Sequence, residues 1–537
     1  MPTLSRDDAG TASASPHQTG AAALLRAGRS ALPAYLGEAG VDPIAIAVTL
    51  LGVLLPTVIV PYAYSDDYSQ LWMAVSGEPS PRFGDSIMQM SAVNGRPLTG
   101  LLAASFFDAA GTIEHLRYIR LFGLLGVIAI ALFVHWALVR SAIKPLPAAL
   151  IAVLICTMPA FQIYAGWTVL FTAPYAALFA GGASVLAASV ADRPWQLASR
   201  RIAAAVALLL AALFVYQPAA MCFWVFLAIA LVGTVYDTRR TLRLVRVHLV
   251  VAGAALALAF IELKLTLLYI GTDNPGAARS ALSYDVIGRL RWFIEQPLYQ
   301  SLNLFDLTPS HRMAAVVGVV GLGGMALWLR GRTPRPWLNM IIAVALVPLC
   351  YLPNLVITEE WPPFRTQAAL SALVALYLGL GAIGIWLWLA EWARPRLRSE
   401  IIRGARRLAW LAAVVVVGTS CLVAATNITR LVAQPQMTEL RMLRAQVLAL
   451  PPDVPRVVFV ETDLFGGMTD TIAYDEFGIP LAARPWTMGP AVSLILHDAG
   501  RLSSAYGGPV MDYYLSGSVE FPPGEPVLDL RGLRSLR

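Results

Sequence analysis

Residues 43–68 read PIAIAVTLLGVLLPTVIVPYAYSDDY, an apolar run that ends in aromatic residues and two adjacent aspartates, Asp66 and Asp67. About 20 mostly apolar residues cross a bilayer as a helix, because every backbone polar group must be hydrogen-bonded internally in hydrocarbon. This run begins too late in the chain for a typical cleaved signal peptide. We therefore expect a retained first membrane span over residues 43–61, with both aspartates just beyond its end.

The composition is that of a membrane protein. The 537 residues are 57% hydrophobic and 14% charged, with a mean hydropathy of +0.64, whereas about a quarter of the residues in a soluble domain are charged. This balance excludes an ordinary cytosolic enzyme. Apolar runs of spanning length predict eleven transmembrane helices, over residues 43–61, 121–139, 146–163, 168–190, 202–216, 218–235, 248–270, 313–329, 337–357, 366–390 and 408–426.

A single interruption separates the fifth run from the sixth. Only Tyr216, Gln217 and Pro218 break the apolar sequence there. The region forms either a hairpin, which we favour, or one long kinked helix.

The basic residues predict the orientation in the membrane. The formal net charge is +7 and the isoelectric point is near 9.3, and many of the arginines fall in short segments such as 239–246. Positive charges favour the cytoplasmic side. We expect residues 1–42 to be cytoplasmic, residues 62–120 and 271–312 to form outer loops, and residues 427–537 to lie outside. The basic charge is thus a topology signal, and a nucleic-acid partner is not needed to explain it.

The composition changes in the tail that follows the last run. Prolines and glycines increase, the run from Arg456 to Glu461 is typical of a short buried strand, and Met437 to Leu450 is typical of a helix. The tail has no nucleophile elbow, phosphate loop or metal-binding spacing. It therefore predicts a small extracytoplasmic α/β domain, which serves the transmembrane domain of residues 43–426 as a lid or an acceptor-docking platform.

The first outer loop opens on Tyr64-Ser65-Asp66-Asp67-Tyr68. Carboxylates at a membrane boundary are costly to desolvate and are candidates for function by default. The aromatic residues Tyr64, Tyr68 and Trp72 would suit an interfacial sugar site. The alternative is structural, with Ser65 or Asp66 as the solvated N-cap of a helix.

A turn follows at Asn94-Gly95-Arg96-Pro97-Leu98. The loop therefore predicts two short helices along the membrane surface, joined by a connection rich in proline and glycine. Asn94 is a candidate substrate contact. Arg96 either binds a phosphate or pairs with Asp85 or a lipid headgroup.

Together these features resemble the GT-C superfamily of membrane glycosyltransferases, and within it the bacterial glucosyltransferase GtrII type. The sharp motifs cover about residues 62–100, and the tail is not covered. The resemblance implies a mainly α-helical, multi-pass protein of the bacterial inner membrane. Such a protein would transfer a sugar from a polyprenyl-phosphate donor to a cell-surface glycan, for example an O-antigen of lipopolysaccharide, or to a lipid-linked acceptor, on the periplasmic face. An acidic residue at the start of the first outer loop is then the general base, either Asp66, which is slightly favoured, or Asp67.

The reaction makes further demands on the chain. A base must take the proton of the acceptor hydroxyl, and arginines should bind the departing lipid phosphate. Arg365, at the outer mouth of the tenth span, is the best candidate for this role. Alternatively, Arg365 forms a surface salt bridge with Glu359 or Glu360. If it does not, these two glutamates are candidate substrate contacts. His311 and Arg312 are a second candidate phosphate site, or else headgroup anchors.

The sequence also leaves open a metal site and two other functions. Asp66, Asp67, Glu359 and Glu360 could in principle hold a divalent cation, but with a monophosphate donor we expect no metal or other cofactor. One other function is an O-antigen-type polymerase or ligase, which the arginines of the second outer loop would suit. The other is a lipid or solute transporter, which would hold its polar groups near the bilayer midplane.

Overall fold

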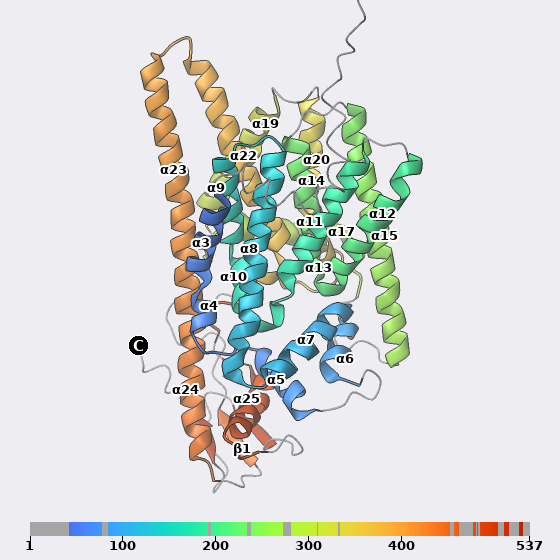
Figure 1. The fold of residues 1–537 in the computed structure, drawn as a ribbon, viewed down its shortest axis with the longest axis vertical. Helices are drawn as coiled ribbons and strands as arrows, with labels where there is room; N and C mark the ends of the chain where they lie inside the picture. The colour runs from blue at the N-terminus through green and yellow to red at the C-terminus, as the bar shows by residue number, and fades with distance from the viewer. Residues whose placement is uncertain are drawn as a thin grey trace, which may run out of the picture.

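The computed structural model describes residues 42–77, 84–191, 195–233, 238–271, 281–308, 310–330, 333, 335–451, 456–460, 476–479, 481, 484–502, 510–514 and 526–529. The predicted cytoplasmic segment, residues 1–42, lies outside these ranges except for Asp42. The described chain is a tall bundle of helices, with a layer of short helices and a small sheet at one end (Figure 1).

The bundle is built from the apolar segments. Its helices are α3 (Asp42–Leu54), α4 (Pro56–Ile59), α8 (Leu116–Arg140), α9 (Pro145–Cys156), α10 (Pro159–Gly166), α11 (Ala173–Val190), α12 (Trp195–Val215), α13 (Gln217–Ala220), α14 (Cys222–Gly233), α15 (Thr238–Ile270), α19 (His311–Arg330), α20 (Pro336–Leu349), α21 (Leu352–Leu355), α22 (Ala368–Ala393) and α23 (Ser399–Thr426).

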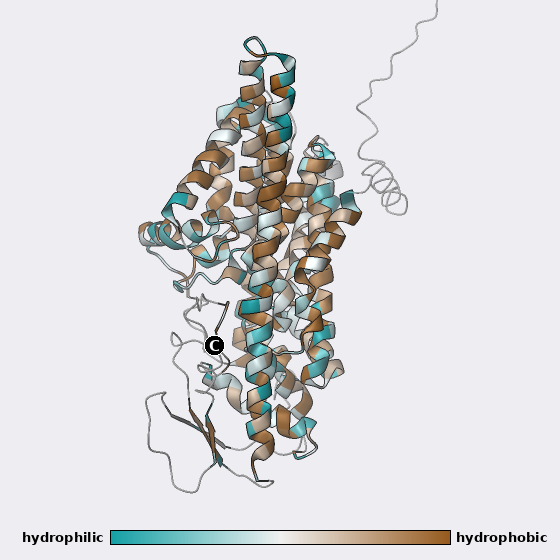
Figure 2. Ribbon diagram, turned by 90° about the vertical axis from the view of Figure 1, so that its left-hand side faces the viewer, coloured by the Kyte–Doolittle hydropathy of each residue, from teal (hydrophilic) through white to brown (hydrophobic). Residues whose placement is uncertain are grey.

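Several of these helices could cross a membrane. Within the described ranges, six helical stretches are long and apolar enough, and α9 with α10 qualify only as a pair bent by 65°. Hydrophobic residues cover much of the length of the long helices, and hydrophilic residues gather at the tip between α22 and α23 (Figure 2). Each of the eleven predicted runs contains helix, but α3 and α20 are shorter apolar helices. The number eleven and the orientation therefore stay predictions.

The chain turns back at Tyr216, which supports the predicted hairpin. α12 ends at Val215, whose carbonyl accepts a hydrogen bond from Thr99 of the first outer loop (2.7 Å). Near the far end of α15, Leu263 lies beside Gly95 of the same loop. Since α15 thus runs toward this loop, α14 runs away from it, and α12 and α14 are the antiparallel arms of the hairpin (Figure 1).

The first outer loop forms three short helices, α5 (Asp67–Ser76), α6 (Ser86–Val93) and α7 (Pro97–Ala110), where two were predicted. At the start of α6, a carboxylate oxygen of Asp85 accepts a hydrogen bond from the backbone N–H of Met88 (2.8 Å). An N-cap of this kind stabilises the beginning of a helix. Asp85 is thus a helix cap, and Arg96 has another partner, described below.

The tail continues the last bundle helix. Residues 399–449 are helical throughout, as α23, the π-helical segment η5 (Asn427–Ala433) and α24 (Gln434–Ala449). The sheet beyond them has parallel strands in the order β2 (Val510–Tyr514), β1 (Arg456–Val460) and β3 (Val527–Asp529), with α25 (Pro485–Asp498) between β1 and β2 in sequence. The strand and the helix expected near residues 456 and 437 are confirmed.

One hydrophobic core joins the tail to the first outer loop. Leu71 of α5 and Phe107 of α7 lie in the same buried cluster as Phe459 of β1 and Met488 of α25. The sheet end of the molecule is therefore fixed to the loop that carries Asp66 and Asp67.

The second outer loop lies against the segment that leads to Arg365. It contains α17 (Val286–Phe293), the π-helical η3 (Ile294–Leu298) and α18 (Tyr299–Leu302). The backbone N–H of Ser283 donates to the Val356 carbonyl, and that of Thr358 donates to the Ala281 carbonyl, both at 2.9 Å. These bonds tie the second loop to the chain between α21 and the short 3-10 helix η4 (Phe364–Thr366).

Glycines bring α19 and α22 into close contact. A Cβ atom added at Gly324 would lie 2.2 Å from the carbonyl oxygen of Gly381, and one added at Gly384 would lie 2.2 Å from the carbonyl oxygen of Gly324. Small residues of this kind allow membrane helices to approach backbone to backbone.

We expect Gly324→Ala to lower the thermal stability of the purified protein in detergent, because the methyl group must push the two helices apart. Overpacking of this sort costs about 1–3 kcal/mol. The control is Gly323→Ala on the same helix, where an added Cβ meets nothing within 4 Å. Equal melting temperatures for the two variants would contradict the close packing.

Candidate active site

Arg120 holds the chain where the first span ends. This buried residue of α8 donates from Nε to the Thr57 carbonyl (2.6 Å) and from Nη1 to the Tyr62 carbonyl (2.9 Å). Nη1 also donates to Oγ1 of Thr168 (3.2 Å), and the guanidinium lies over the Tyr62 ring, 3.9 Å from its centroid. The turn that leads to the two aspartates is thus fixed to α8 and to the segment before α11.

Asp67 is the inner member of the pair. It is fully buried at the start of α5, and its two carboxylate oxygens accept backbone N–H groups, from Tyr64 and from Val169, both at 3.0 Å. Burial raises the pKa of Asp67 from 3.8 to about 7, while the nearby Arg120 and the hydrogen bonds offset part of the rise. Asp67 therefore joins the aspartate turn to the chain before α11.

Asp66 is the outer member. It is partly exposed, and its Oδ1 accepts hydrogen bonds from the indole N–H of Trp486 (3.0 Å) and from the Ser65 hydroxyl (3.3 Å). Among the described residues both bonds end on Oδ1, which leaves Oδ2 open. Asp66 occupies the N-cap position of α5, but its side chain makes no capping hydrogen bond. The alternative role of Asp66 as a helix N-cap therefore does not apply. Ser65 has a φ of 49°, a strained conformation of the kind that occurs at functional sites.

A row of arginine and aromatic side chains extends from this turn. We call Arg484, Tyr64, Trp167, Arg365 and Trp361 the arginine–aromatic row. The Arg484 guanidinium lies 5.1 Å from the Tyr64 ring centroid, and Tyr64 meets Trp167 edge to face at 5.1 Å. The Arg365 guanidinium lies 5.2 Å from the Trp167 centroid and 4.6 Å from the Trp361 centroid. The Arg365 guanidinium therefore lies within cation–π distance of two tryptophan rings.

Arg365 has a buried carboxylate partner. Glu476 accepts from Nη1 of Arg365 and, at 3.3 Å, from its backbone N–H. The Glu476 carbonyl also accepts the Tyr64 hydroxyl (2.6 Å). The sequence left open a salt bridge between Arg365 and Glu359 or Glu360. In the structure, Arg365 pairs with Glu476 instead.

Glu359 and Glu360 belong to another contact. The buried Arg289 of α17 forms an ion pair with Glu360 (3.4 Å) and donates to the carbonyls of Glu359 (3.0 Å) and Asn354 (2.7 Å). Arg291, two residues later, is exposed and pairs with Glu295. The second loop thus holds the chain before Arg365 through Arg289.

Arg96 packs against the break at Tyr216. Its Nε donates to Oε1 of Gln217 (3.0 Å), and its guanidinium lies 4.6 Å from the Tyr216 ring centroid. The Tyr216 ring lies 6.0 Å from the ring of Tyr164, whose hydroxyl donates to the Arg365 carbonyl (2.9 Å). Arg96 and Arg365 are therefore linked through two tyrosines.

The remaining predicted contacts lie elsewhere. Tyr68 is fully buried in the core shared with the tail, and Trp72 packs against that core. The Asn94 side chain donates to the Met90 carbonyl. His311 and Arg312 are exposed at the start of α19, where His311 faces Tyr299. Among the described contacts, none joins these residues to Asp66 or Arg365.

The site also contains a buried donor that the sequence analysis missed. Trp167 is 6% exposed, and its indole N–H has no hydrogen-bond partner among the described residues. An unsatisfied buried donor costs about 1–3 kcal/mol. Because Trp167 lies beside Arg365, this N–H is suited to an oxygen atom of a bound ligand.

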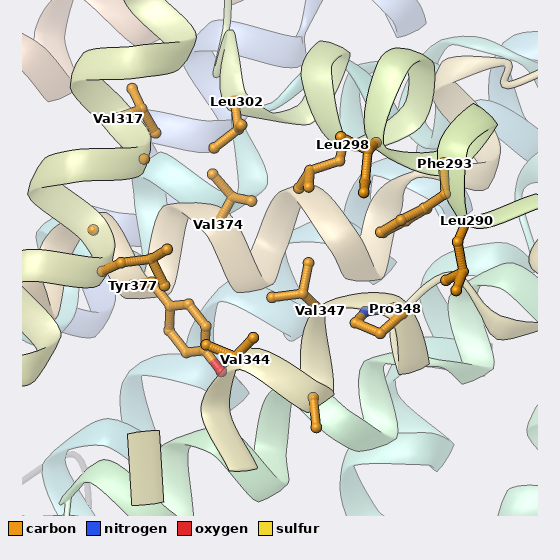
Figure 3. Close-up of a pocket in the computed structure, with 15 residues that line it drawn as sticks. Leu290, Phe293, Leu298, Leu302, Val317, Val344, Val347, Pro348, Val374 and Tyr377 are labelled. Atoms are coloured by element: carbon orange, nitrogen blue, oxygen red, sulfur yellow. The ribbon is translucent and has the colours of Figure 1, made fainter. Parts of the chain in front are cut away.

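An apolar cavity of about 400 Å³ opens between the second loop and the bundle. Its walls come from α17, η3, α18, α19, α20 and α22, and include Leu290, Leu302, Val317, Val344 and Val374 (Figure 3). α22, which lines the cavity with Val374 and Tyr377, begins at Ala368, three residues after Arg365. This cavity could not be predicted from the sequence, because its lining residues have the composition of any apolar helix face.

Three tail residues complete the site, namely Glu476, Arg484 and Trp486. The string Arg484-Pro485-Trp486 combines a basic and an aromatic residue at a helix start. It could have drawn attention to Arg484 and Trp486 but does not assign them a partner, and Glu476 has no comparable signal. Within the described ranges no three His, Cys, Asp or Glu residues gather as a metal site would need.

Comparisons with known proteins give structural likenesses. No family model and no curated protein matches the chain. It is similar to the oligosaccharyltransferase of Archaeoglobus fulgidus, crystallised with zinc and sulfate, at a TM-score of 0.43 and 12% identity; the match covers 85% of this chain and 61% of that one. It is also similar to ArnT from Cupriavidus metallidurans, crystallised with undecaprenyl phosphate, at a TM-score of 0.36 and 13% identity, covering 87% and 88%. The chain spans about three fifths of the archaeal protein's length.

We expect the stability of the wild type relative to Asp67→Asn to decrease as the pH rises from about 4 to about 7. The folded pKa is about 7 against an ordinary 3.8, so the contribution of Asp67 is fully present below 3.8 and is lost as the pH approaches 7. At the acid end of this range, the side-chain amide of the variant has a single acceptor oxygen and cannot accept from the backbone N–H groups of both Tyr64 and Val169. The loss should lower the stability of the variant by about 1–3 kcal/mol. Thermal unfolding at several pH values, with Asp66→Asn as control, measures this. If the stability of the wild type relative to Asp67→Asn increased with pH instead, the pKa of Asp67 would be lowered in the folded protein, not raised.

Proposed function

We propose that the protein is a membrane glycosyltransferase of the GT-C type, which transfers a sugar from a polyprenyl-phosphate donor to a hydroxyl of a glycan or lipid-linked acceptor. The observation that carries the proposal is the partly exposed Asp66 carboxylate, held on a rigid turn directly beside the arginine–aromatic row. A base and cationic donors in one site are what glycosyl transfer from a phosphate requires.

In this proposal Asp66 is the base and Asp67 is a positioning residue. Asp66 Oδ2 takes the proton of the acceptor hydroxyl while its oxygen bonds to the anomeric carbon. The bond from that carbon to the phosphate oxygen breaks, and the polyprenyl phosphate leaves with the electron pair. Asp67, whose oxygens are both occupied, holds the turn.

The departing phosphate gains negative charge, and the row supplies the cations. The guanidinium of Arg365 has five N–H groups, and Glu476 accepts from Nη1. The indole N–H of Trp167 adds a neutral donor beside them. Glu476 and the two tryptophan rings orient Arg365, and Arg484 supplies a second positive charge at the other end.

The apolar cavity suits the isoprenoid chain of the donor. It lies between helices, has a volume of about 400 Å³ and is lined by aliphatic and aromatic side chains, as lipid-binding cavities are. A donor held there would bring its phosphate toward Arg365 from the membrane side. We place the reaction on the outer face of a bacterial inner membrane and assign the enzyme to the GtrII type.

The direct test uses the full-length protein in nanodiscs, a panel of undecaprenyl-phosphate-linked hexoses and pentoses, and the surface glycan of source cells that lack the gene. We expect transfer by the wild type and a loss of about 100-fold or more in Asp66→Asn, with an unchanged melting temperature. Mass spectrometry of the glycan measures the product. Full activity of Asp66→Asn would remove Asp66 as the base, and an absence of transfer from every donor by the wild type would overturn the function.

A second prediction concerns the phosphate. We expect Arg365→Lys to reduce kcat/KM for the donor by about 100-fold, because an ammonium group cannot reproduce the planar donors or the stacking of a guanidinium. The control is Arg291→Lys, at an exposed arginine of the second loop. The same small loss in both variants would contradict the assignment of Arg365.

A further inference from the structure

The second residue of α25, Trp486, presents an aromatic surface next to the candidate base. Its side chain is 61% exposed, and its indole N–H donates to Oδ1 of Asp66 at 3.0 Å. A tryptophan exposed to this extent leaves a large apolar face in water. Because its N–H edge is hydrogen-bonded to Oδ1, this exposed indole lies next to the carboxylate that would take the proton.

The position of Trp486 is set by its neighbours. Arg484 donates to the Tyr64 hydroxyl (3.3 Å), and the Thr487 hydroxyl donates to the Arg484 carbonyl (2.8 Å). Thr487 and Met488 are fully buried, and Met488 belongs to the core that includes α5. Trp486 is therefore an exposed side chain on a helix start that is anchored by buried neighbours.

We propose that Trp486 forms the acceptor subsite, which binds a pyranose ring of the acceptor glycan on its indole face. This inference rests on the proposed function and names the substrate class of the same site. The C–H face of a pyranose is apolar and packs on an aromatic ring, while its hydroxyl groups point outward from the ring edge. A sugar stacked on Trp486 directs an edge hydroxyl at Oδ2 of Asp66.

The arginine–aromatic row separates this subsite from the donor side. Arg365 and Trp361 lie at one end of the row, next to the helix that lines the apolar cavity. Trp486 adjoins the other end, two residues after Arg484. A lipid-linked donor enters from the cavity, an aqueous glycan enters from the tail, and the acceptor hydroxyl meets the donor sugar at Asp66.

The test compares Trp486→Ala with Trp486→Phe in the full-length protein in nanodiscs. Both variants lose the N–H that orients Asp66, so both should lower kcat and the slow hydrolysis of the donor in the absence of acceptor. Only Trp486→Ala loses the aromatic face, and we expect it to raise KM for the acceptor glycan roughly tenfold, while Trp486→Phe stays within about twofold. The control, Trp337→Ala, removes a tryptophan that is 59% exposed at the start of α20.

The outcomes separate the two proposals. Equal acceptor KM values for Trp486→Ala and Trp486→Phe, with donor hydrolysis intact in the wild type, would overturn the subsite and leave the transferase standing. No consumption of any donor by the wild type would overturn the transferase. In that case direct binding of the same glycan decides the subsite: loss in Trp486→Ala and retention in Trp486→Phe support it, and equal binding overturns it.

Discussion

A buried guanidinium organises the end of the first apolar helical segment, where α4 stops. The helix ends at Ile59, and the carbonyl groups at a helix end have no partner within the helix. Arg120 donates to the carbonyls of Thr57 and Tyr62, where unpaired groups near hydrocarbon would be costly. Its charge in turn stabilises the ionised form of Asp67. The opposite environments of the two aspartates, one enclosed and one open, follow from this arrangement.

The site depends as much on long-range packing as on that turn. The carboxylate of Asp66 and the indole of Trp486 are 420 positions apart in sequence, and they meet because the tail shares a core with the first loop. Glu476 and Arg484 reach Tyr64 through the same packing. The membrane bundle supplies Trp167 and Arg365, so neither half of the molecule contains the whole site.

Local sequence patterns suggested the candidates that lie next to an apolar run. The acidic pair after the first run made Asp66 and Asp67 candidates, and the basic residue before another run made Arg365 one; their roles stay predictions. The same reasoning grouped Tyr68 with Tyr64 because both are aromatic, but α5 turns Tyr68 into the core. Partners from the tail carry no periodic signal, so Glu476 and Trp486 could be assigned only once the chain was folded. The number of spans is also difficult to predict from sequence. A short or kinked helix such as α20 has the apolar composition of a span but is not long enough to be one.

The uninterrupted helix from Ser399 to Ala449 connects the two ends of the molecule and fixes the distance between them. Its 51 residues, at 1.5 Å each, extend for about 75 Å, more than twice the roughly 30 Å of bilayer hydrocarbon. One end lies at the tip next to α22 and the other reaches the sheet. The distance from the tip to the sheet is thereby set by the length of one helix. A stretch of this helix that crossed the hydrocarbon layer would leave more than half of its length to extend beyond that layer.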